Sequence, residues 1–482
     1  MRSSRLQTFL VVAALSIFIG LAVSSLRLDS ATFDEGKHLP VGYAFLKFGD
    51  YRFDPDNPAL ARMLAATPLL FMDVRVDRDH ETYRQAQVWR FGHRFLYEWN
   101  DADRLLLRGR LVIVALGAIL ALLVYLWTRT LVGVPAAAAA LFLCVLNPEV
   151  LAHGRLATTD LCVTFFFFAT VAAFERLTAK VTWQRMLLTG ACLGCALASK
   201  FSAVTLLPVL GVLALVVALG PAPLEMSLGK LAGTGASNSI ATRRGRVVAL
   251  TALLAGIGII AWIVIWAVYR FRYAPSAEPG TDTLAWDALG AHGGILDPLV
   301  RAASDAHLLP KSYLYGFLDM MRRGQGHPSF LMGKVSQEGS WSYFVVTFLL
   351  KTPIPLMLLL IGGAVATLRS RPRALRVDFF LWLPPIIYGA AAMGHGLNIG
   401  HRHLLPTVPF LLVIAGRAAA GLWERPGRHA WKPVVLLLAA WYALSTVRIH
   451  PSYLAYFNGI AGGPANGPRY LVDSNLDWGQ DL

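Results

Sequence analysis

Long apolar runs separated by short polar segments dominate the sequence from one end to the other. Most runs approach about 20 residues, the length that an α-helix needs to cross a bilayer. The pattern therefore predicts an all-α polytopic membrane protein with about eleven transmembrane helices and two large loops. The predicted helices cover 6–26, 109–128, 134–152, 157–174, 183–199, 201–220, 247–269, 342–368, 378–394, 403–421 and 431–447.

Composition agrees with this fold class. Of the 482 residues, 56% are hydrophobic and only 15% are charged, which is too apolar for a soluble domain. All four cysteines fall inside apolar runs, so packing explains them better than a disulfide or zinc framework. Arg2 and Arg5 precede the first run as in a signal peptide. Without a convincing cleavage site, we expect this run to remain as the first transmembrane helix.

The net charge of +15 comes largely from short loops between apolar runs, which indicates membrane orientation rather than nucleic-acid binding. If the N-terminus is cytoplasmic, the short basic loops all fall on the cytoplasmic side, as the positive-inside rule requires. The densest of them is the run Arg369–Arg376. The others contain Arg129; Arg176, Lys180 and Arg185; Lys230, Arg243, Arg244 and Arg246; and Arg417, Arg425, Arg428 and Lys432.

This orientation assigns a transmembrane module to 1–447, with outer loops at 27–108 and 270–341. The segment 448–482 is expected outside as a separate C-terminal part. The chain stops at Leu482 without a terminal cap, which leaves open that an outer domain is missing.

Distinctive polar residues gather on the predicted outer side. The adjacent carboxylates Asp34 and Glu35 directly follow the first apolar run, although a solvated acidic loop is the simple alternative. Asp160 opens the fourth run, where a helix N-terminus alone would favour a carboxylate. Lys200 occupies a hairpin tip and could snorkel. Lys351 lies inside an apolar run, so it must face a polar cavity, snorkel or pair.

Two stretches of the first outer loop are amphipathic. Residues 58–71 are apolar except for Arg62, which predicts a short interfacial helix with its cation at the lipid headgroup level. Residues 87–99 combine aromatic and basic side chains, and simple membrane anchoring explains them best.

Several motifs resemble those of GT-C glycosyltransferases, most closely bacterial family-39, protein O-mannosyltransferase-like enzymes. The acidic pair Asp34-Glu35 with His38 resembles the first outer loop of that family. Asn57-Pro-Ala-Leu-Ala-Arg62 is similar to a His-Pro-Pro-Leu-Ala-Lys element, with Asn and Arg as departures. The motif 154–160 resembles the second acidic position, and 398–406 and 473–481 resemble a bacterial subfamily.

The resemblance implies an inverting glycosyltransferase with a GT-C-like architecture. Such enzymes move a sugar from a polyprenyl-phosphate carrier to an acceptor protein, lipid or glycan outside the bacterial cytoplasmic membrane. Asp34 is the expected base, Glu35 is the alternative base, and Asp160 would either orient the acceptor or help to hold a divalent ion with Asp34. No cofactor is implied with certainty, and a divalent cation is left open. The expected phosphate-binding residues are Arg62, Lys200, Arg402 and Lys351, and the expected substrate-binding residues are His38, His401, His403 and Trp478.

Two other functions fit part of the pattern. A multispanning lipid-glycan transporter would also have about a dozen spans, but it would more often show paired repeats, and the sequence has no internal repeat. Another envelope glycan enzyme of the polymerase or ligase kind is the second alternative. The identities of the sugar and the acceptor are not predicted from the sequence.

Overall fold

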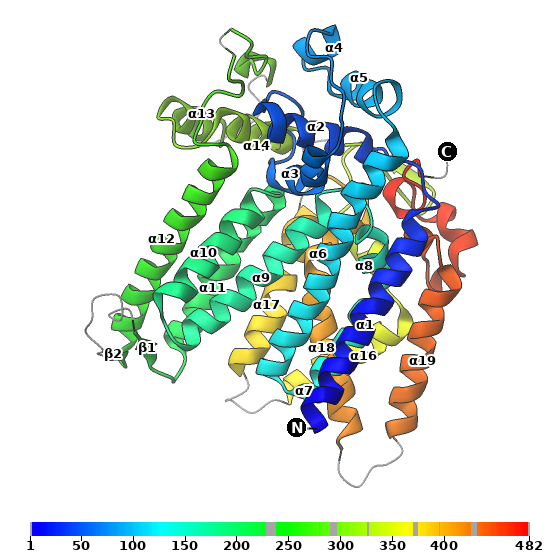
Figure 1. Cartoon of the computed structure of the whole chain (residues 1–482). Helices are drawn as coiled ribbons and strands as arrows, with labels where there is room; N and C mark the ends of the chain where they lie inside the picture. The colour runs from blue at the N-terminus through cyan, green and yellow to red at the C-terminus, as the bar shows by residue number, and fades with distance from the viewer. Residues whose placement is uncertain are drawn as a thin grey trace.

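A computed structural model describes residues 2–227, 238–278, 280–289, 296–324, 327–369, 375–394, 396–425 and 431–480. Within these ranges the chain is almost entirely helical, as the apolar runs predicted. The long helices run side by side in Figure 1. They are α1 (Arg2–Leu26), α6 (Ala102–Leu131), α9 (Asp160–Ala179), α10 (Trp183–Leu197), α11 (Leu206–Leu219), α12 (Arg243–Val268), α16 (Ile354–Leu368), α17 (Leu375–Gly394), α18 (Val408–Trp423) and α19 (Trp431–Ile449).

Every predicted run contains helix, but several runs are too short or too bent to be counted as spans. Eight helical segments of the described chain are long and apolar enough to cross a membrane. A ninth span results if α15 (Tyr343–Lys351) and α16 are counted together. The helix α10 has only 15 residues and α7 (Val134–Val145) only 12. The predicted number of eleven is therefore not confirmed.

Prolines and helix caps explain where two of the runs break. Asn147 caps α8 (Pro148–His153) by accepting hydrogen bonds from the backbone N–H groups of Glu149 and Val150. Pro148 at the first position of α8 has no N–H to donate, so it starts a new helix rather than extending α7. Pro353 separates α15 from α16 in the same way, and these two helices meet at 113°.

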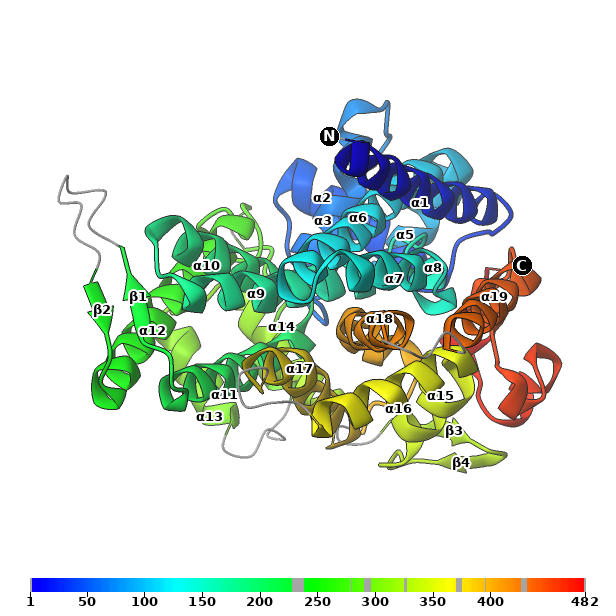
Figure 2. The same ribbon diagram turned by 90° about the horizontal axis from the view of Figure 1, so that it is seen from below.

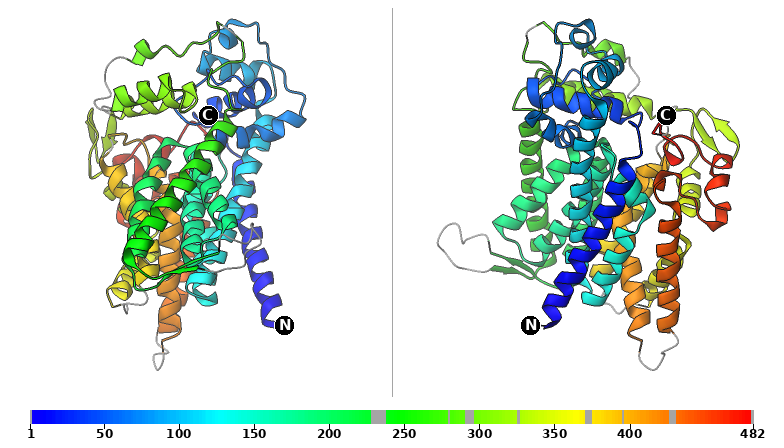
Figure 3. Two further views of the ribbon diagram at one scale, coloured as in Figure 1. Left: turned by 90° about the vertical axis from the view of Figure 1, so that its left-hand side faces the viewer. Right: turned by 45° about the vertical axis from the view of Figure 1, so that its right-hand side comes forward.

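The two large loops and the C-terminal segment gather at one end of the helix bundle, opposite the N-terminus (Figures 1 and 3). We call this the loop end. The first loop contributes α2 (Glu35–Phe48), α3 (Leu60–Ala66), α4 (Glu81–Arg84) and α5 (Val88–His93). The second contributes α13 (Leu296–Asp305) and α14 (Lys311–Arg323), with an antiparallel hairpin of β3 (Ser329–Leu331) and β4 (Lys334–Ser336).

The opposite end carries the N-terminus and the second hairpin, formed by β1 (Leu224–Met226) and β2 (Asn238–Ile240). Arg369 and Arg376 flank residues 370–374, so the centre of the most basic predicted loop lies outside the described residues. The segregation of the two outer loops from the hairpin loop follows the alternation that the sequence predicted.

Packing of the bundle depends on small residues where helices cross. The helix α10 packs against α9 and α12, and α18 packs against α7 and α16 (Figure 2). A side chain at Gly416 of α18 would collide with the backbone of α7 at Ala136 and Ala140. Close approach of this kind is typical of membrane helices, because lipid offers no hydrophobic force to drive their association.

Candidate active site

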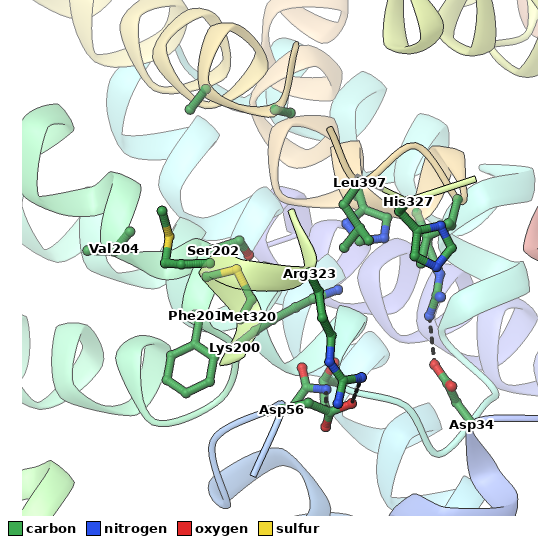
Figure 4. A pocket seen from close by; sticks show the side chains of 18 of the residues that line it. Asp34, Asp56, Lys200, Phe201, Ser202, Val204, Met320, Arg323, His327 and Leu397 are labelled. Carbon is green, nitrogen blue, oxygen red and sulfur yellow. Dashed lines mark hydrogen bonds and ion pairs between the residues drawn. The ribbon is translucent and has the colours of Figure 1, made fainter. Parts of the chain in front are cut away.

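A cavity of about 440 Å³ opens at the loop end, where the first loop, the second loop and the α17–α18 connection meet. Figure 4 shows Asp34, Asp56, Lys200 and Arg323 around this space. One part of its wall is polar and the other is apolar. The polar lining residues are Asp34, Lys37, Asp56, Asn57, Thr159, Lys200, Ser202, Thr205, Arg323, His327, Arg402 and His403.

Asp34 directly precedes α2 and pairs with Arg402, which lies 368 residues away in the 3₁₀ helix His401–Thr407. The Arg402 Nη1 atom donates to Asp34 Oδ2 at 2.9 Å. The Asp34 side chain keeps 17% of its surface exposed, so a substrate hydroxyl can reach the carboxylate. Burial raises the pKa of Asp34, but Arg402, followed by His38 and Lys37, outweighs it and holds the pKa below its ordinary value.

Asp160 lies beneath the cavity and holds its cations together. Lys200 Nζ is 2.5 Å from Asp160 Oδ1, and Arg402 Nη1 is 3.5 Å from Asp160 Oδ2. The Asp160 side chain is only 1% exposed and does not line the cavity. The Nε atom of Arg402 is buried and has no hydrogen-bond partner among the described residues.

Glu35, the alternative base, is buried in an ion pair and does not line the cavity. Its carboxylate is fully buried and accepts from Arg110 Nε at 2.9 Å and Nη2 at 2.7 Å. The N–H groups of Ala157 and Thr32 donate to the same carboxylate. Burial raises the pKa of Glu35, but Arg110 and these hydrogen bonds outweigh burial and lower it. The first turn of α2 turns the neighbouring side chains in different directions.

Arg62 and Lys351, two predicted phosphate ligands, lie away from the cavity lining. Arg62 is 1% exposed and donates to Asp54 Oδ2 at 2.8 Å, so it does not face the lipid headgroup level. Lys351 is also buried and lies 3.3 Å from Glu149 Oε1. Each buried cation is paired, as the cost of desolvating a charge requires. Of the four predicted cations, Lys200 and Arg402 are the two that reach the cavity.

Of the three predicted histidines, one lines the cavity and two do not. His403 lines the cavity. His401 faces a small separate pocket, where its Nδ1 is 3.1 Å from Thr347 Oγ1. His38 lies in α2 and is buried, with no hydrogen-bond partner for either ring nitrogen among the described residues. Burial lowers the pKa of His38 to about 3, so the ring is neutral at ordinary pH.

Trp478 was predicted to contact substrate, but it does not line the cavity. It is 5% exposed, and its ring centre lies 3.9 Å from the guanidinium carbon of Arg402. The aromatic ring therefore covers one face of the Arg402 guanidinium, which itself lines the cavity.

The sequence analysis missed a second cluster of charged residues, which lies at the cavity wall. Lys37 Nζ pairs with Asp56 at 2.8 Å and with Asp54 at 3.1 Å, and Arg323 of α14 lies 3.6 Å from Asp56. Burial opposes the charge on Lys37, but the two carboxylates raise its pKa above the ordinary value. The position of Lys37 three residues after Asp34 was the only available signal. Nothing in the sequence brings Arg323 beside the first loop.

Within the described residues, no group of three or more His, Cys, Asp or Glu side chains is placed to hold a metal ion. The sequence left open that a divalent cation links Asp34 and Asp160. The structure instead places an arginine between them. The Arg402 guanidinium lies within hydrogen-bonding range of both carboxylates. A cation of the protein itself therefore occupies the place between the two acids.

Comparison with known proteins supports the resemblance seen in the motifs. A model of the dolichyl-phosphate-mannose-protein mannosyltransferase family matches residues 94–269. No curated protein matches the sequence significantly.

Solved structures match almost the whole chain at low identity. Apo ArnT from Cupriavidus metallidurans is 13% identical with a TM-score of 0.53, over 94% of this chain and 70% of that one. ArnT bound to undecaprenyl phosphate is 13% identical with a TM-score of 0.50, over 92% and 71%. The oligosaccharyltransferase AglB from Archaeoglobus fulgidus, in complex with an inhibitory peptide and a dolichol-phosphate, is 14% identical with a TM-score of 0.52.

The AglB match covers 98% of this chain and 56% of AglB, so this chain spans just over half of that protein. These similarities show the fold. The chain has the all-α, multi-pass GT-C architecture that the resemblance predicted.

Proposed function

We propose that this protein is an inverting glycosyltransferase that moves a sugar from a polyprenyl-phosphate carrier to an acceptor. The observation that carries the proposal is a cavity whose lining combines the Asp34 carboxylate and the Lys200 and Arg402 cations with apolar side chains. ArnT has been solved with undecaprenyl phosphate and AglB with a dolichol-phosphate, and both share this fold. A donor with a charged head and an apolar tail fits such a cavity.

The apolar wall supports the assignment of the lipid part. Phe201 and Val204 precede α11, Ala391 lies in α17, and Phe344 lies in α15. These residues border helices that belong to the membrane bundle, so a lipid tail could leave the cavity sideways into the bilayer. The charged head would then lie between Lys200 and Arg402.

The reaction needs one bond to form and one to break. The acceptor oxygen attacks the anomeric carbon, and Asp34 accepts the proton of the attacking hydroxyl. The bond from the anomeric carbon to the phosphate oxygen breaks, and its electron pair stays on the carrier phosphate. Arg402 and Lys200 stabilise this negative charge. A single displacement of this kind inverts the configuration of the sugar carbon.

Release of polyprenyl phosphate tests the function directly. Purified protein would be incubated with a polyprenyl-phosphate sugar and an envelope fraction as the source of acceptor. We expect free polyprenyl phosphate and a labelled acceptor to appear together. Movement of the intact donor across reconstituted vesicles, without cleavage, would instead identify a transporter.

Lys200→Ala should weaken binding of the carrier phosphate. One lost charge-assisted contact costs about 1.5–3 kcal/mol, which corresponds to a roughly 10- to 150-fold higher dissociation constant for polyprenyl phosphate. Titration of the detergent-solubilised variant with polyprenyl phosphate measures the effect. Lys47→Ala is the matched control, because Lys47 lies exposed at the end of α2 outside the cavity lining. Equal affinities for wild type and Lys200→Ala would place the phosphate elsewhere.

Arg402→Gln should move the acid limb of the pH profile to higher pH. Asp34 must be ionised to act as a base, and Arg402 is the strongest of the cations that lower its pKa. Without this charge, burial raises the pKa of Asp34, so the base becomes protonated at a higher pH than in the wild type. The profile of kcat/KM against pH reports this value for the free enzyme. An unshifted acid limb would show that another group is the base.

We further propose that the loop end faces the outside of a bacterial cytoplasmic membrane. Exposed positions at the two ends allow a test by cysteine labelling. Ala306→Cys at the loop end should react with a membrane-impermeant thiol reagent in intact cells, and Ala241→Cys beside β2 only after permeabilisation. The wild type, whose described cysteines are buried or half-buried in apolar helices, gives the background. Labelling of both variants from the same side would contradict the orientation.

A further inference from the structure

The end of the described C-terminal segment, residues 473–480, lies directly behind the Asp34–Arg402 ion pair. On the Asp34 side, the N–H of Phe33 donates to the Trp478 carbonyl at 2.8 Å, and the N–H of Ser30 donates to the Gln480 carbonyl at 3.0 Å. On the Arg402 side, the N–H of His401 donates to Asn475 Oδ1 at 2.8 Å. One short segment is therefore bonded to the immediate chain neighbours of both Asp34 and Arg402.

Trp478 supplies the side chain that contacts Arg402 itself. The indole ring packs on the guanidinium group at 3.9 Å, and the two side chains shield each other from water. A cation over a desolvated aromatic face is held more strongly than one in solvent. With one face covered and Nη1 bonded to Asp34, the plane of the guanidinium is fixed. Its Nε is buried and has no hydrogen-bond partner among the described residues, so the packing of Trp478 and the Nη1 contacts hold the group in place.

The segment is itself anchored by buried polar contacts that the proposed chemistry does not use. Lys351 Nζ donates to the carbonyl oxygens of Asn475 at 2.8 Å and Leu454 at 2.7 Å. Asn475 Nδ2 donates to the Tyr343 hydroxyl at 3.0 Å. These contacts give the cation inside the apolar run a role, because Lys351 ties the C-terminal segment to α15.

Gly400 permits this close approach. A Cβ atom at Gly400 would lie 2.3 Å from Ser474 Oγ and 3.2 Å from Arg402 Cγ. Ser474 Oγ also donates to the Ile399 carbonyl at 2.9 Å. Residues 473–480 are therefore in contact with the residues that directly precede Arg402. Any side chain at position 400 therefore requires the Ser474 hydroxyl to move and presses on the Arg402 side chain.

We propose that residues 473–480 form a positioning element, in which Trp478 holds Arg402 against Asp34 for transfer. This inference rests on the proposed function, since it assigns a role within the same site. Trp478 acts through Arg402 and does not contact substrate, because it lies outside the cavity lining. Its loss is expected to disturb the base and the phosphate site together.

The test compares Trp478→Ala, Trp478→Phe and Gly400→Ala with the wild type. Trp478→Ala should lower kcat by about 5- to 30-fold, the range expected for loss of a buried cation–π contact. The acid limb of its kcat/KM profile should move to higher pH, because Arg402 no longer stays beside Asp34. Trp478→Phe keeps an aromatic face and should recover most of both properties. Gly400→Ala should shift the acid limb in the same direction as Trp478→Ala.

Trp341→Ala is the matched control, because Trp341 lies 75% exposed and outside the cavity lining. A wild-type kcat and an unshifted acid limb in Trp478→Ala would overturn the proposal. If Trp478→Ala does not fold, Gly400→Ala decides, and an unshifted acid limb in Gly400→Ala would overturn the proposal.

A structure of Trp478→Ala in lipid nanodiscs gives a readout that needs no activity. Arg402 displaced from Asp34 supports the positioning role even if no sugar transfer is found for the wild type. An Arg402 still placed against Asp34 contradicts it, whatever the fate of the proposed function.

Discussion

Asp34→Asn should reduce sugar transfer by about 10²- to 10⁴-fold, the usual cost of losing a general base. The amide has the shape of the carboxylate but cannot accept the proton of the attacking hydroxyl. Binding of polyprenyl phosphate should persist, because Lys200 and Arg402 remain in place. The measurement is turnover of the polyprenyl-phosphate sugar at saturating donor, with donor affinity determined separately.

Asp79→Asn is the matched control for this substitution. Asp79 is an exposed carboxylate of the same loop, between α1 and α6, and does not line the cavity. Turnover close to wild type in Asp34→Asn, together with a folded but inactive Glu35→Gln, would transfer the role of base to Glu35. Normal turnover in both variants would contradict the mechanism itself.

Glu35→Gln should instead destabilise the protein by about 3–5 kcal/mol, the cost of leaving one member of a buried ion pair without its partner. The Arg110 guanidinium lies 2.7 Å from the Glu35 carboxylate and would lose its counter-charge inside the fold. The midpoint of thermal unfolding in detergent should fall by several degrees. Glu81→Gln, an exposed acid in the same loop, should leave the midpoint nearly unchanged.

Two further measurements distinguish a structural role for Glu35 from a catalytic one. The double variant Glu35→Gln with Arg110→Gln should be more stable than the sum of the single effects predicts, because neither charge is left alone.

The lowered pKa of Glu35 also sets the direction of the pH dependence of stability. The ion pair stabilises the wild type above the ordinary carboxyl value of 4.5, and this contribution is lost as the pH falls through the lowered pKa. As the pH is lowered through this range, the free energy of unfolding of Glu35→Gln should therefore fall less than that of the wild type.

The local sequence pattern was sufficient to predict the fold class. It also predicted that the candidate site residues lie at the same end of the helix bundle. Apolar runs identify membrane helices because the bilayer requires backbone hydrogen bonds to be satisfied within each segment. Alternation of the runs then placed Asp34, Asp160, Lys200 and Arg402 at one end, and the structure brings all four together. The number of spans was harder to predict, because Pro148 and Pro353 interrupt apolar runs that look continuous in the sequence.

Tertiary structure decided which of these groups line the cavity. Asp34 and Glu35 are neighbours in sequence and equal in chemistry, but the first turn of α2 sends one carboxylate toward the cavity and the other into a buried pair with Arg110. Arg62 and Lys351 looked like phosphate ligands, but each is neutralised by a carboxylate inside the protein. Trp478 lies against Arg402 although 76 residues separate them. The sequence determines which charges lie near the membrane edge, whereas burial and pairing, which depend on contacts distant in the chain, determine which of them remain available to a substrate.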